Sequence, residues 1–463
     1  MNERILPRFA DKTMAAELVS ALSDEYAVVE NPPYIHPRYE LYPLSRGVSR
    51  LERGLAAAVM DMDGTTTTTE PVCIHALDTM TRRASGRADD PSWPGLDHAR
   101  DYPHIIGNST TKHVEYLVRA YGDGFREDAL RQHYIAGAAW TLGHGKDELR
   151  RREVRSTLAA TGLAGLLSDA RFQALCASAD HRDPEAAALL AALAAETAGA
   201  FTCAGVAART RACIDIYYHR YHEVLEAVGR GEGDVAAREI LGPGSSRLVG
   251  PMPGVGVFLA LLRGLLGAHA GAFAGMLCAQ LEQAGVAPPP PGEARALLEG
   301  LGRHFAARPA KLALVTSSIA YEAHLVLGEI FRVLRSERPG WPVPQGLRDT
   351  LLGAFSDPLV FYDAVITATD SSEIRLKPHR DLYSIALHEL GVYPGDFDRV
   401  AGFEDSESGT IAIRAAGIGL SCALPFAMTR GHRFQAATQV CPGGLPEVML
   451  EKGLFLNREG TES

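Results

Sequence analysis

Short apolar runs, separated by helix-like segments, mark the possible strands of this chain. They are residues 56–60, KLALVT (311–316), DAVIT (363–367), RVAGF (399–403) and GIGLSC (417–422). Apolar runs of this length are typical of strands that are buried on both faces of a parallel sheet. Because the strands alternate with helical segments, the pattern predicts a doubly wound α/β sheet.

The chain between the first two runs has a different pattern. It is rich in Ala, Leu, Arg and Glu, as in EAAALLAALAAETAGAF (185–201), and this composition favours helices. We therefore expect a helical domain inserted into an α/β core. The expected parts are an N-terminal extension (1–50), a core (51–70 and 250–463, with a further insertion at 266–308) and the helical domain (71–249).

Length and charge narrow the class of protein. A chain of 463 residues is too long for one compact core, which agrees with two structural units. The formal net charge of -10 disfavours nucleic acid or an anionic membrane as the main partner, because both bind basic surfaces. The apolar stretch 254–280 is interrupted by Arg263 and His269, so we expect a buried helix pair there rather than a membrane span.

The cysteines and the N-terminus indicate a compartment. The seven cysteines are scattered and form no CxxC pair, so they predict neither a disulfide framework nor a zinc site. The first residues, MNERILPRFADKTM, contain no apolar secretory segment. We therefore expect a cytoplasmic protein with reduced thiols.

Polar residues follow the ends of several predicted strands. Asp61 ends the first run, Asp63 follows it, Thr316 ends the second run, and Glu404 and Asp405 follow the run at 399–403. Ligands of parallel α/β sheets bind beyond the carboxyl ends of the strands, so these side chains are expected to meet. Carboxylate and carbonyl oxygens suit Mg²⁺, whereas hydroxyls, backbone amides and a lysine suit a phosphoryl group.

The motifs resemble those of the haloacid dehalogenase superfamily. DMDGT (61–65) is similar to its first motif, LALVTSS (312–318) to its second, LKPHRDLY (376–383) to the lysine motif and GFEDSESG (402–409) to its fourth. TTEP (68–71), PMPGVGVFLALL (251–262) and HIIGNSTTKHVEYLV (104–118) resemble its β-phosphoglucomutase and phosphoglycolate phosphatase branch. The resemblance implies a three-layer Rossmann-like core with a helical cap.

The resemblance also implies a role for each matching residue. Asp61 would be the nucleophile that forms an aspartyl phosphate, and Asp63 would be the general acid and base. Thr316 and Lys377 would hold the phosphoryl oxygens. The implied phosphate or substrate contacts are Gly64, Thr65, Ser317, Asn108 and Lys112, and the implied Mg²⁺ ligands are Asp61, Asp63, Glu404 and Asp405. Asn108 and Lys112 equally fit a solvated helix start.

Three functions stay open at this point. The first is a Mg²⁺-dependent phosphatase that acts on a small phosphorylated metabolite, such as a sugar phosphate or a phosphoglycolate-like compound. The second is a sugar phosphomutase of the β-phosphoglucomutase type. That group has a histidine near the segment where this chain has Cys73, with His75 two residues away. The third is a non-catalytic protein that binds a phosphate ester or serves in assembly.

Overall fold

The computed structural model describes most of the chain. The described residues are 9–31, 35–107, 109–178, 180–181, 183–370, 373, 375–429, 431–450 and 454–455. The strands are β1 (Tyr26–Glu30), β2 (Tyr39–Pro43), β3 (Ala57–Asp61), β4 (Lys311–Val315), β5 (Ala364–Ile366), β6 (Val400–Glu404), β7 (Leu420–Ala423) and β8 (Gln439–Val440). Each predicted strand region thus contains a strand.

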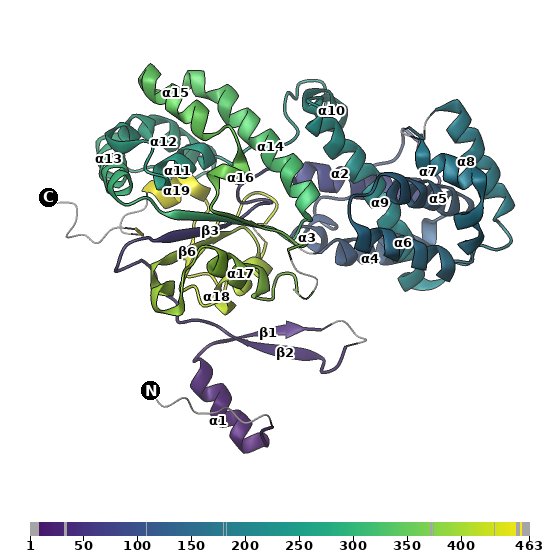
Figure 1. Ribbon diagram of the computed structural model, residues 1–463, viewed down its shortest axis with the longest axis horizontal. Helices are drawn as coiled ribbons and strands as arrows, with labels where there is room; N and C mark the ends of the chain where they lie inside the picture. The colour runs from purple at the N-terminus through teal and green to yellow at the C-terminus, as the bar shows by residue number, and fades with distance from the viewer. Residues whose placement is uncertain are drawn as a thin grey trace. The chain divides into compact units, whose positions relative to one another are not determined.

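The α-helices connect these strands and fill the long segment between β3 and β4 (Figure 1). They are α1 (Lys12–Leu22), α2 (Glu70–Ala84), α3 (Tyr102–Ile105), α4 (Thr110–Tyr121), α5 (Glu127–His144), α6 (Glu148–Ala160), α7 (Ala170–Ala177), α8 (Pro184–Glu196), α9 (Gly205–Gly229), α10 (Gly233–Leu241), α11 (Val255–Leu262), α12 (Ala274–Gln283), α13 (Pro291–Ala307), α14 (Ala320–Glu337), α15 (Gln345–Ala354), α16 (Pro358–Phe361), α17 (Asp381–Glu389), α18 (Glu407–Ala415) and α19 (Gly444–Leu450). Short 3₁₀ helices are η1 (Gly122–Gly124), η2 (Ala164–Ser168), η3 (Gly267–Phe273), η4 (Arg338–Gly340) and η5 (Pro394–Arg399).

The main sheet has six strands in the order β5-β4-β3-β6-β7-β8, and every neighbouring pair is parallel. The central strand β3 is buried along its whole length, which explains why its sequence AAVMD lacks polar alternation. The chain builds the sheet outward from β3 through β4 to β5, and then crosses to the other side of β3 with β6. Such a reversal opens a ligand-binding crevice at the carboxyl ends of the two central strands.

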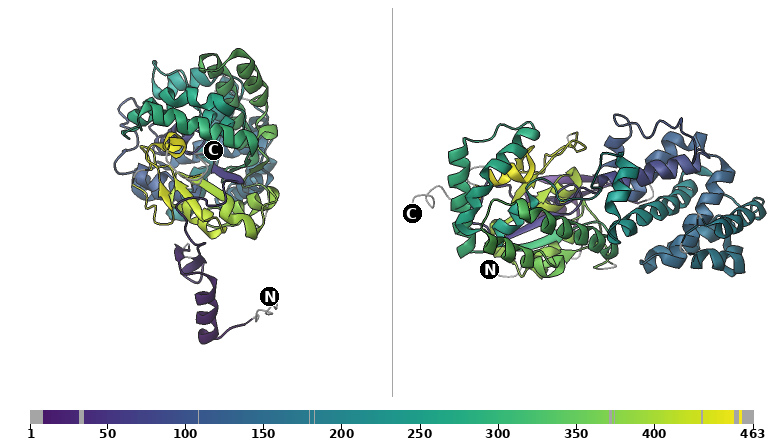
Figure 2. Two further views of the ribbon diagram at one scale, coloured as in Figure 1. Left: turned by 90° about the vertical axis from the view of Figure 1, so that its left-hand side faces the viewer. Right: turned by 90° about the horizontal axis from the view of Figure 1, so that it is seen from above.

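Helices cover both faces of the sheet (Figure 1, Figure 2). On one face, α17 and α18 contribute Leu382, Ala386 and Ile413 to a core cluster that includes Val59 of β3. On the other face, Phe258 of α11 packs edge-on against Phe403 of β6, with 5.2 Å between ring centroids. The prediction of a three-layer α/β core with a large helical insertion is confirmed.

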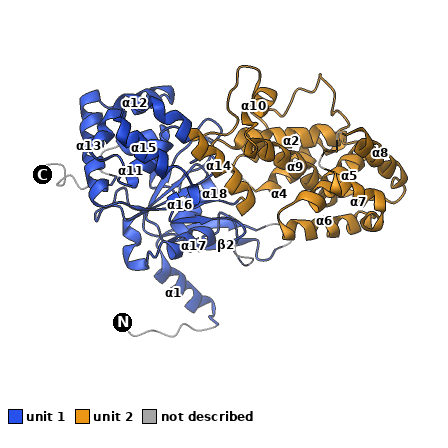
Figure 3. Cartoon of the chain, turned by 45° about the horizontal axis from the view of Figure 1, so that its top comes forward, with its two compact units in different colours: residues 1–66, 252–317, 334–463 blue, residues 67–251, 318–333 orange. Residues whose placement is uncertain are grey.

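The chain divides into two compact units, which Figure 3 colours separately. Unit 1 comprises Met1–Thr66, Met252–Ser317 and Leu334–Ser463, and unit 2 comprises Thr67–Pro251 and Ser318–Val333. Among the described residues, every strand lies in unit 1. Unit 2 is helical and also takes in the first part of α14, a segment that the sequence pattern assigns to the core. The helices α2, α4 and α5 pack around the long helix α9 inside unit 2.

The two segments that lead into and out of the helical insertion run side by side. Thr67 forms an antiparallel bridge with Pro251, and the backbone N–H of Thr68 donates to the carbonyl of Gly250 at 2.8 Å. The N–H of Met252 donates to the carbonyl of Thr66 at 3.1 Å. The threonine run after Asp63 thus pairs in part with the returning chain.

The sequence pattern missed an antiparallel hairpin near the N-terminus. Strands β1 and β2 pair along their whole length, although the segment shows little periodic alternation. None of the residues of α1, which precedes the hairpin, is buried. The hairpin therefore depends on contacts with later parts of unit 1, since a two-stranded ribbon is marginally stable alone.

The apolar stretch at 254–280 folds into α11, η3 and the first part of α12, as the sequence predicts for a buried helical segment. Leu259, Leu261 and Phe273 are buried there. Among the described residues, no helix combines the length and hydropathy that crossing a membrane requires.

Candidate active site

Three carboxylates from the two central strands meet at the carboxyl edge of the sheet. Asp61 is the last residue of β3, Glu404 is the last residue of β6, and Asp405 follows it. All three are buried, and ligand oxygens of the three lie within 4.8 Å of one another. The register explains the meeting, because Met60 of β3 pairs with Phe403 of β6.

Lys377 lies between two of these carboxylates. Its ammonium contacts Oδ1 of Asp61 and donates to Oε1 of Glu404 at 2.7 Å. It also lies 3.4 Å from the carbonyl oxygen of Val315, at the end of β4. Lys377 therefore brings a buried positive charge to the carboxylate cluster, and its contact with a phosphoryl group stays a prediction.

Glu404 is held by hydrogen bonds on both carboxylate oxygens. Oε1 accepts from Lys377 and, at 3.1 Å, from the hydroxyl of Tyr383. Oε2 accepts from the N–H groups of Asp405 and Ser406, both at 3.1 Å, and from the Ser406 hydroxyl at 2.8 Å. Both oxygens of Glu404 are thus occupied by protein donors.

The start of α18 is shaped to approach Glu404 closely. Ser406 caps the helix, and its hydroxyl oxygen accepts from the N–H of Gly409 at 3.1 Å. A Cβ at position 409 would lie 1.8 Å from the Glu404 carboxyl carbon, so only glycine fits there. The spacing in GFEDSESG is therefore explained by the packing of one carboxylate against a helix N-terminus.

Asp63 lies just beyond β3, where the chain turns. Gly64 has φ of 80°, a left-handed conformation that favours glycine, and the turn lets Asp63 return toward the sheet edge. The hydroxyl of Thr316, which follows β4, donates to Oδ2 of Asp63 at 3.1 Å. Thr316 therefore contacts Asp63 in this structure, whereas the resemblance predicts a contact with the phosphoryl group.

The remaining predicted contacts are placed in different environments. The Thr65 hydroxyl is buried and lies 3.5 Å from Oδ1 of Asp405. Ser317 follows Thr316 and is exposed. Lys112 is an exposed residue of α4, in unit 2. Asn108 lies outside the described residues. The structure thus brings Thr65 to the cluster, and the substrate roles of Lys112 and Asn108 stay predictions.

The charges of the cluster are unbalanced. Burial raises the pKa of Asp61 well above its usual range, and the Glu404 carboxylate raises it further. Burial acts to lower the pKa of Lys377, but Asp61 and Glu404 outweigh it, so this pKa is raised and the lysine stays charged. One ammonium serves two carboxylates here, and the buried Asp405 lies beside them.

The donor set fits a divalent cation. Asp61 and Asp405 supply hard oxygen atoms in a buried cluster, which Mg²⁺ prefers as ligands. Burial, followed by the Glu404 charge, raises the pKa of Asp61, and a bound cation would favour the ionised form of this carboxyl group. Glu404 fits less well as a direct ligand, because protein donors already occupy both of its oxygens.

Sequence reasoning missed Tyr383, whose ring lies beside the cluster. The Lys377 ammonium is 5.2 Å from the centre of the Tyr383 ring, within cation–π range. Burial and the nearby Glu404 carboxylate raise the pKa of Tyr383 well above its usual range, so the phenol stays a donor. Its position in LKPHRDLY, six residues after the lysine and in the first turn of α17, was the available signal.

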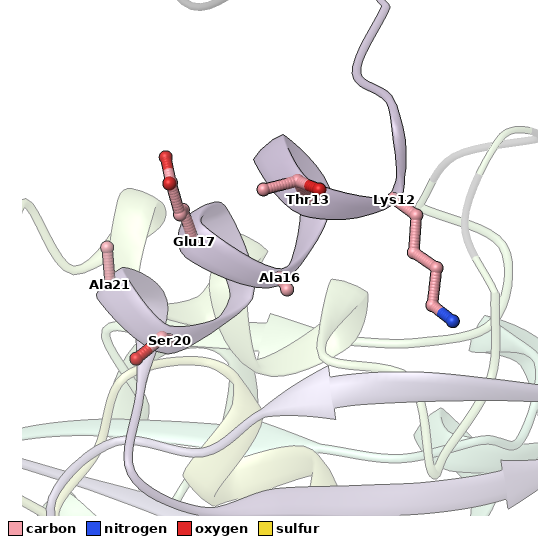
Figure 4. A pocket seen from close by; sticks show the side chains of 6 residues that line it. All are labelled: Lys12, Thr13, Ala16, Glu17, Ser20 and Ala21. Atoms are coloured by element: carbon pink, nitrogen blue, oxygen red, sulfur yellow. The ribbon is translucent and has the colours of Figure 1, made fainter.

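A surface hollow of about 720 Å³ lies elsewhere, along α1 (Figure 4). Its lining comes from one helix and consists of Lys12, Thr13, Ala16, Glu17, Ser20 and Ala21. None of the predicted site residues lines it, and it contains no arrangement of groups comparable with the buried carboxylate cluster. The buried carboxylate cluster at the sheet edge is therefore the candidate site.

Comparisons with known proteins give likenesses of fold. No protein-family model and no curated protein matches the sequence. The solved structure of CbbY from Rhodobacter sphaeroides, in complex with phosphate, is 16% identical with a TM-score of 0.38, covering 87% of this chain and 100% of that chain. A HAD family hydrolase from Deinococcus radiodurans, with bound phosphate and sodium, is 14% identical with a TM-score of 0.37, covering 87% and 98%.

A third solved structure is β-phosphoglucomutase from Clostridium difficile. It is 10% identical with a TM-score of 0.33, covering 88% of this chain and 94% of that chain. These neighbours are of the haloacid dehalogenase family, which the motifs of the sequence resemble.

Proposed function

We propose that this chain is a Mg²⁺-dependent phosphatase that hydrolyses a small phosphate monoester through an aspartyl phosphate on Asp61. The observation that supports it most is the contact of Lys377 with Asp61 inside a buried carboxylate cluster. A carboxylate reacts with an anionic phosphate only where positive charge offsets the repulsion. The lysine and a bound cation would supply that charge.

The first step is an in-line displacement at phosphorus. A carboxylate oxygen of Asp61 forms the new P–O bond, and the bond to the ester oxygen breaks with its electron pair going to the leaving alkoxide. Asp63 donates the proton that turns the alkoxide into an alcohol. The Thr316 hydroxyl donates a hydrogen bond to Oδ2 of Asp63 and thereby orients this carboxyl group.

The second step returns the enzyme to its starting state. Asp63, now ionised, accepts a proton from a water molecule as the water oxygen attacks phosphorus. The P–O bond to Asp61 breaks, its electrons return to the carboxylate, and inorganic phosphate is released. Lys377 stays beside Asp61 through both steps and holds phosphoryl oxygens.

Mg²⁺, when bound, would polarise the phosphoryl oxygens and offset their charge. Asp61 and Asp405 would hold it, together with the backbone carbonyl of Asp63. Glu404 would act on the site through Lys377 and through the turn that carries Asp405.

The substrate class follows from the chemistry of the site. The reacting group is a phosphate monoester, and we propose that the rest of the substrate is a small metabolite such as a sugar phosphate or a phosphoglycolate-like acid. The seven free cysteines agree with a reducing compartment, and we propose the cytoplasm.

Phosphate release tests this proposal. The native protein would be incubated with a panel of sugar phosphates, phosphoglycolate and nucleotides, with Mg²⁺ or with EDTA. Release that requires Mg²⁺ and is lost in both Asp61→Asn and Asp63→Asn supports the proposal. Asp396→Asn, at a partly exposed residue outside the carboxylate cluster, controls for the loss of an acidic residue. Phosphate release that survives in Asp61→Asn would overturn the proposal. Conversion of one sugar phosphate isomer to another with a bisphosphate primer would instead identify a mutase.

A further inference from the structure

The N-terminal hairpin contacts the loop that carries Lys377. The hydroxyl of Tyr42, in β2, forms a hydrogen bond with Nδ1 of His379 and lies 3.2 Å from its Nε2. The two rings are 5.0 Å apart. Two residues before the lysine, Arg375 lies 3.4 Å from Oε2 of Glu40, also in β2. The hairpin therefore contacts the loop on both sides of Lys377.

The hydrogen bonds at this contact form a short chain. Tyr42 donates its one hydroxyl proton to Oε2 of Glu40 at 3.1 Å, so it accepts from the N–H of His379. Burial, followed by the hydrogen bond to Glu40, raises the pKa of Tyr42 to about 12, and the phenol stays neutral. The Glu40–Arg375 pair is more exposed and is expected to contribute less than the Tyr42–His379 contact.

The hairpin is itself fixed to the core of unit 1. The guanidinium of Arg414, at the end of α18, contacts the carboxylate of Glu25 and the carbonyl oxygen of Ser45. The N–H of Val48 donates to the carbonyl of Gly419 at 3.1 Å. Ala27 and Leu44 pack with Ala415 in a small apolar cluster. A segment anchored in this way can hold a loop in place.

We propose that the N-terminal hairpin is a positioning element that holds the 375–379 loop, and hence Lys377, in the geometry for phosphoryl binding. The role of the first 50 residues is thereby linked to the site, although none of them belongs to the motifs. This inference rests on the proposed function. Tyr42 and His379 act through Lys377 and are positioning residues, since neither contacts Asp61 or Glu404.

Kinetics of point variants in the full-length protein test the proposal. Tyr42→Phe keeps the ring and removes the hydroxyl, and His379→Ala removes the partner. Each is expected to lower kcat/KM about 3- to 10-fold and to raise the inhibition constant of inorganic phosphate by a similar factor. The double variant should lose little more than either single variant, because both changes remove one contact.

Two further variants serve as controls. His379→Gln keeps an N–H donor that can reach the Tyr42 hydroxyl, and it should restore most of the loss seen in His379→Ala. Arg38→Ala breaks an exposed pair with Glu30 on the same hairpin, away from the loop, and should leave kinetics unchanged.

The affinity for inorganic phosphate distinguishes a hairpin that positions Lys377 from a hairpin that only helps the protein to fold. Loss of folded protein lowers the apparent kcat but does not change the inhibition constant of phosphate. The proposal is therefore overturned if Tyr42→Phe and His379→Ala leave that constant and KM unchanged, whatever happens to the melting temperature. If the native protein hydrolyses no ester, the proposed function fails. Calorimetric binding of inorganic phosphate with Mg²⁺, native against Tyr42→Phe, then decides whether the hairpin positions Lys377.

Discussion

The hydroxyl of Tyr383 donates a 3.1 Å hydrogen bond to Oε1 of Glu404, the oxygen that also accepts from Lys377. The same tyrosine presents its ring to the lysine ammonium at 5.2 Å. One buried side chain of α17 thus fixes both members of the Lys377–Glu404 pair. The orientation of the lysine at the carboxylate cluster depends on α17 as well as on its own loop.

Replacing Tyr383 with Phe should weaken the site while keeping the fold. The ring and its contact with Lys377 remain, but Glu404 loses one donor and can shift with the lysine. We expect kcat/KM for the phosphatase reaction to fall about 3- to 10-fold, the range for one hydrogen bond. Steady-state kinetics would measure it. Tyr393→Phe, at an exposed tyrosine, should have no effect, and an equal loss in that control would contradict the assignment.

Glu404 and Asp405 should respond differently to loss of charge. Glu404→Gln places an amide N–H₂ against existing donors, so we expect a loss of about 2–4 kcal/mol in the free energy of unfolding. Asp405→Asn removes a proposed cation ligand, and we expect the Mg²⁺ concentration for half-maximal activity to rise at least about tenfold.

Denaturant unfolding and Mg²⁺ titration of activity would be run on both variants. The division of roles fails if Glu404→Gln is fully stable and shifts the Mg²⁺ requirement more than Asp405→Asn does. That result would instead support Glu404 as a direct Mg²⁺ ligand, as the sequence resemblance implies.

The sequence was sufficient to predict five of the six strands of the main sheet, and to predict that charged residues follow the ends of its central strands. The runs that form β3, β6 and β7 are buried at every strand position, and that of β4 at all but its first, which is why hydrophobicity located these strands. The edge strand β5 is only partly buried. Asp61, Lys377 and Glu404 meet because parallel strands end at one edge of the sheet. That consequence of topology can be anticipated from strand ends in a sequence.

Other features could not be anticipated because they depend on distant contacts. The hairpin of β1 and β2 has weak alternation and is anchored through Arg414, almost 400 residues later. The contact between Thr316 and Asp63 depends on the turn at Gly64. The short strand β8 has only two residues, too few for any pattern.

Asp61 should reduce the stability of the protein when no cation is bound. Two buried carboxylates, Asp61 and Glu404, share one lysine, and replacing Asp61 with Asn leaves a balanced Glu404–Lys377 pair. We therefore expect Asp61→Asn to gain about 1–2 kcal/mol in stability without Mg²⁺ while losing all turnover. Thermal unfolding with EDTA and with Mg²⁺ would show it. The half-buried Asp63→Asn should show no such gain, and a less stable Asp61→Asn would refute the charge argument.

Lowering the pH should reduce the stability of unit 2, because unit 2 contains histidines that are neutral in the folded protein. Nε2 of His75, in α2, accepts a 3.0 Å hydrogen bond from the guanidinium of Arg220, in α9, which requires an unprotonated ring nitrogen. Burial, followed by the charge of Arg220, lowers the pKa of His75 from 6.5 to about 4. Burial likewise lowers the pKa of His133 to about 4. The unfolded chain therefore binds more protons in this range, and stability should fall as the pH drops from 6.5 toward 4.

Replacing His75 with Gln tests this dependence. The Gln side-chain oxygen can still accept from Arg220, but it does not titrate, so the fall in melting temperature between pH 6.5 and 4 should be smaller than in the native protein. At pH 4, the two proteins should differ by at most about 3 kcal/mol in how much unfolding free energy they have lost since pH 6.5. This follows because one unit of the His75 pKa shift corresponds to about 1.4 kcal/mol. Part of the pH dependence of the melting temperature should remain, because the pKa of His133 is also lowered. Melting temperatures would be measured at several pH values, with His98→Gln as the exposed control. Equal slopes for native protein and His75→Gln would show that this histidine is not the source of the acid sensitivity.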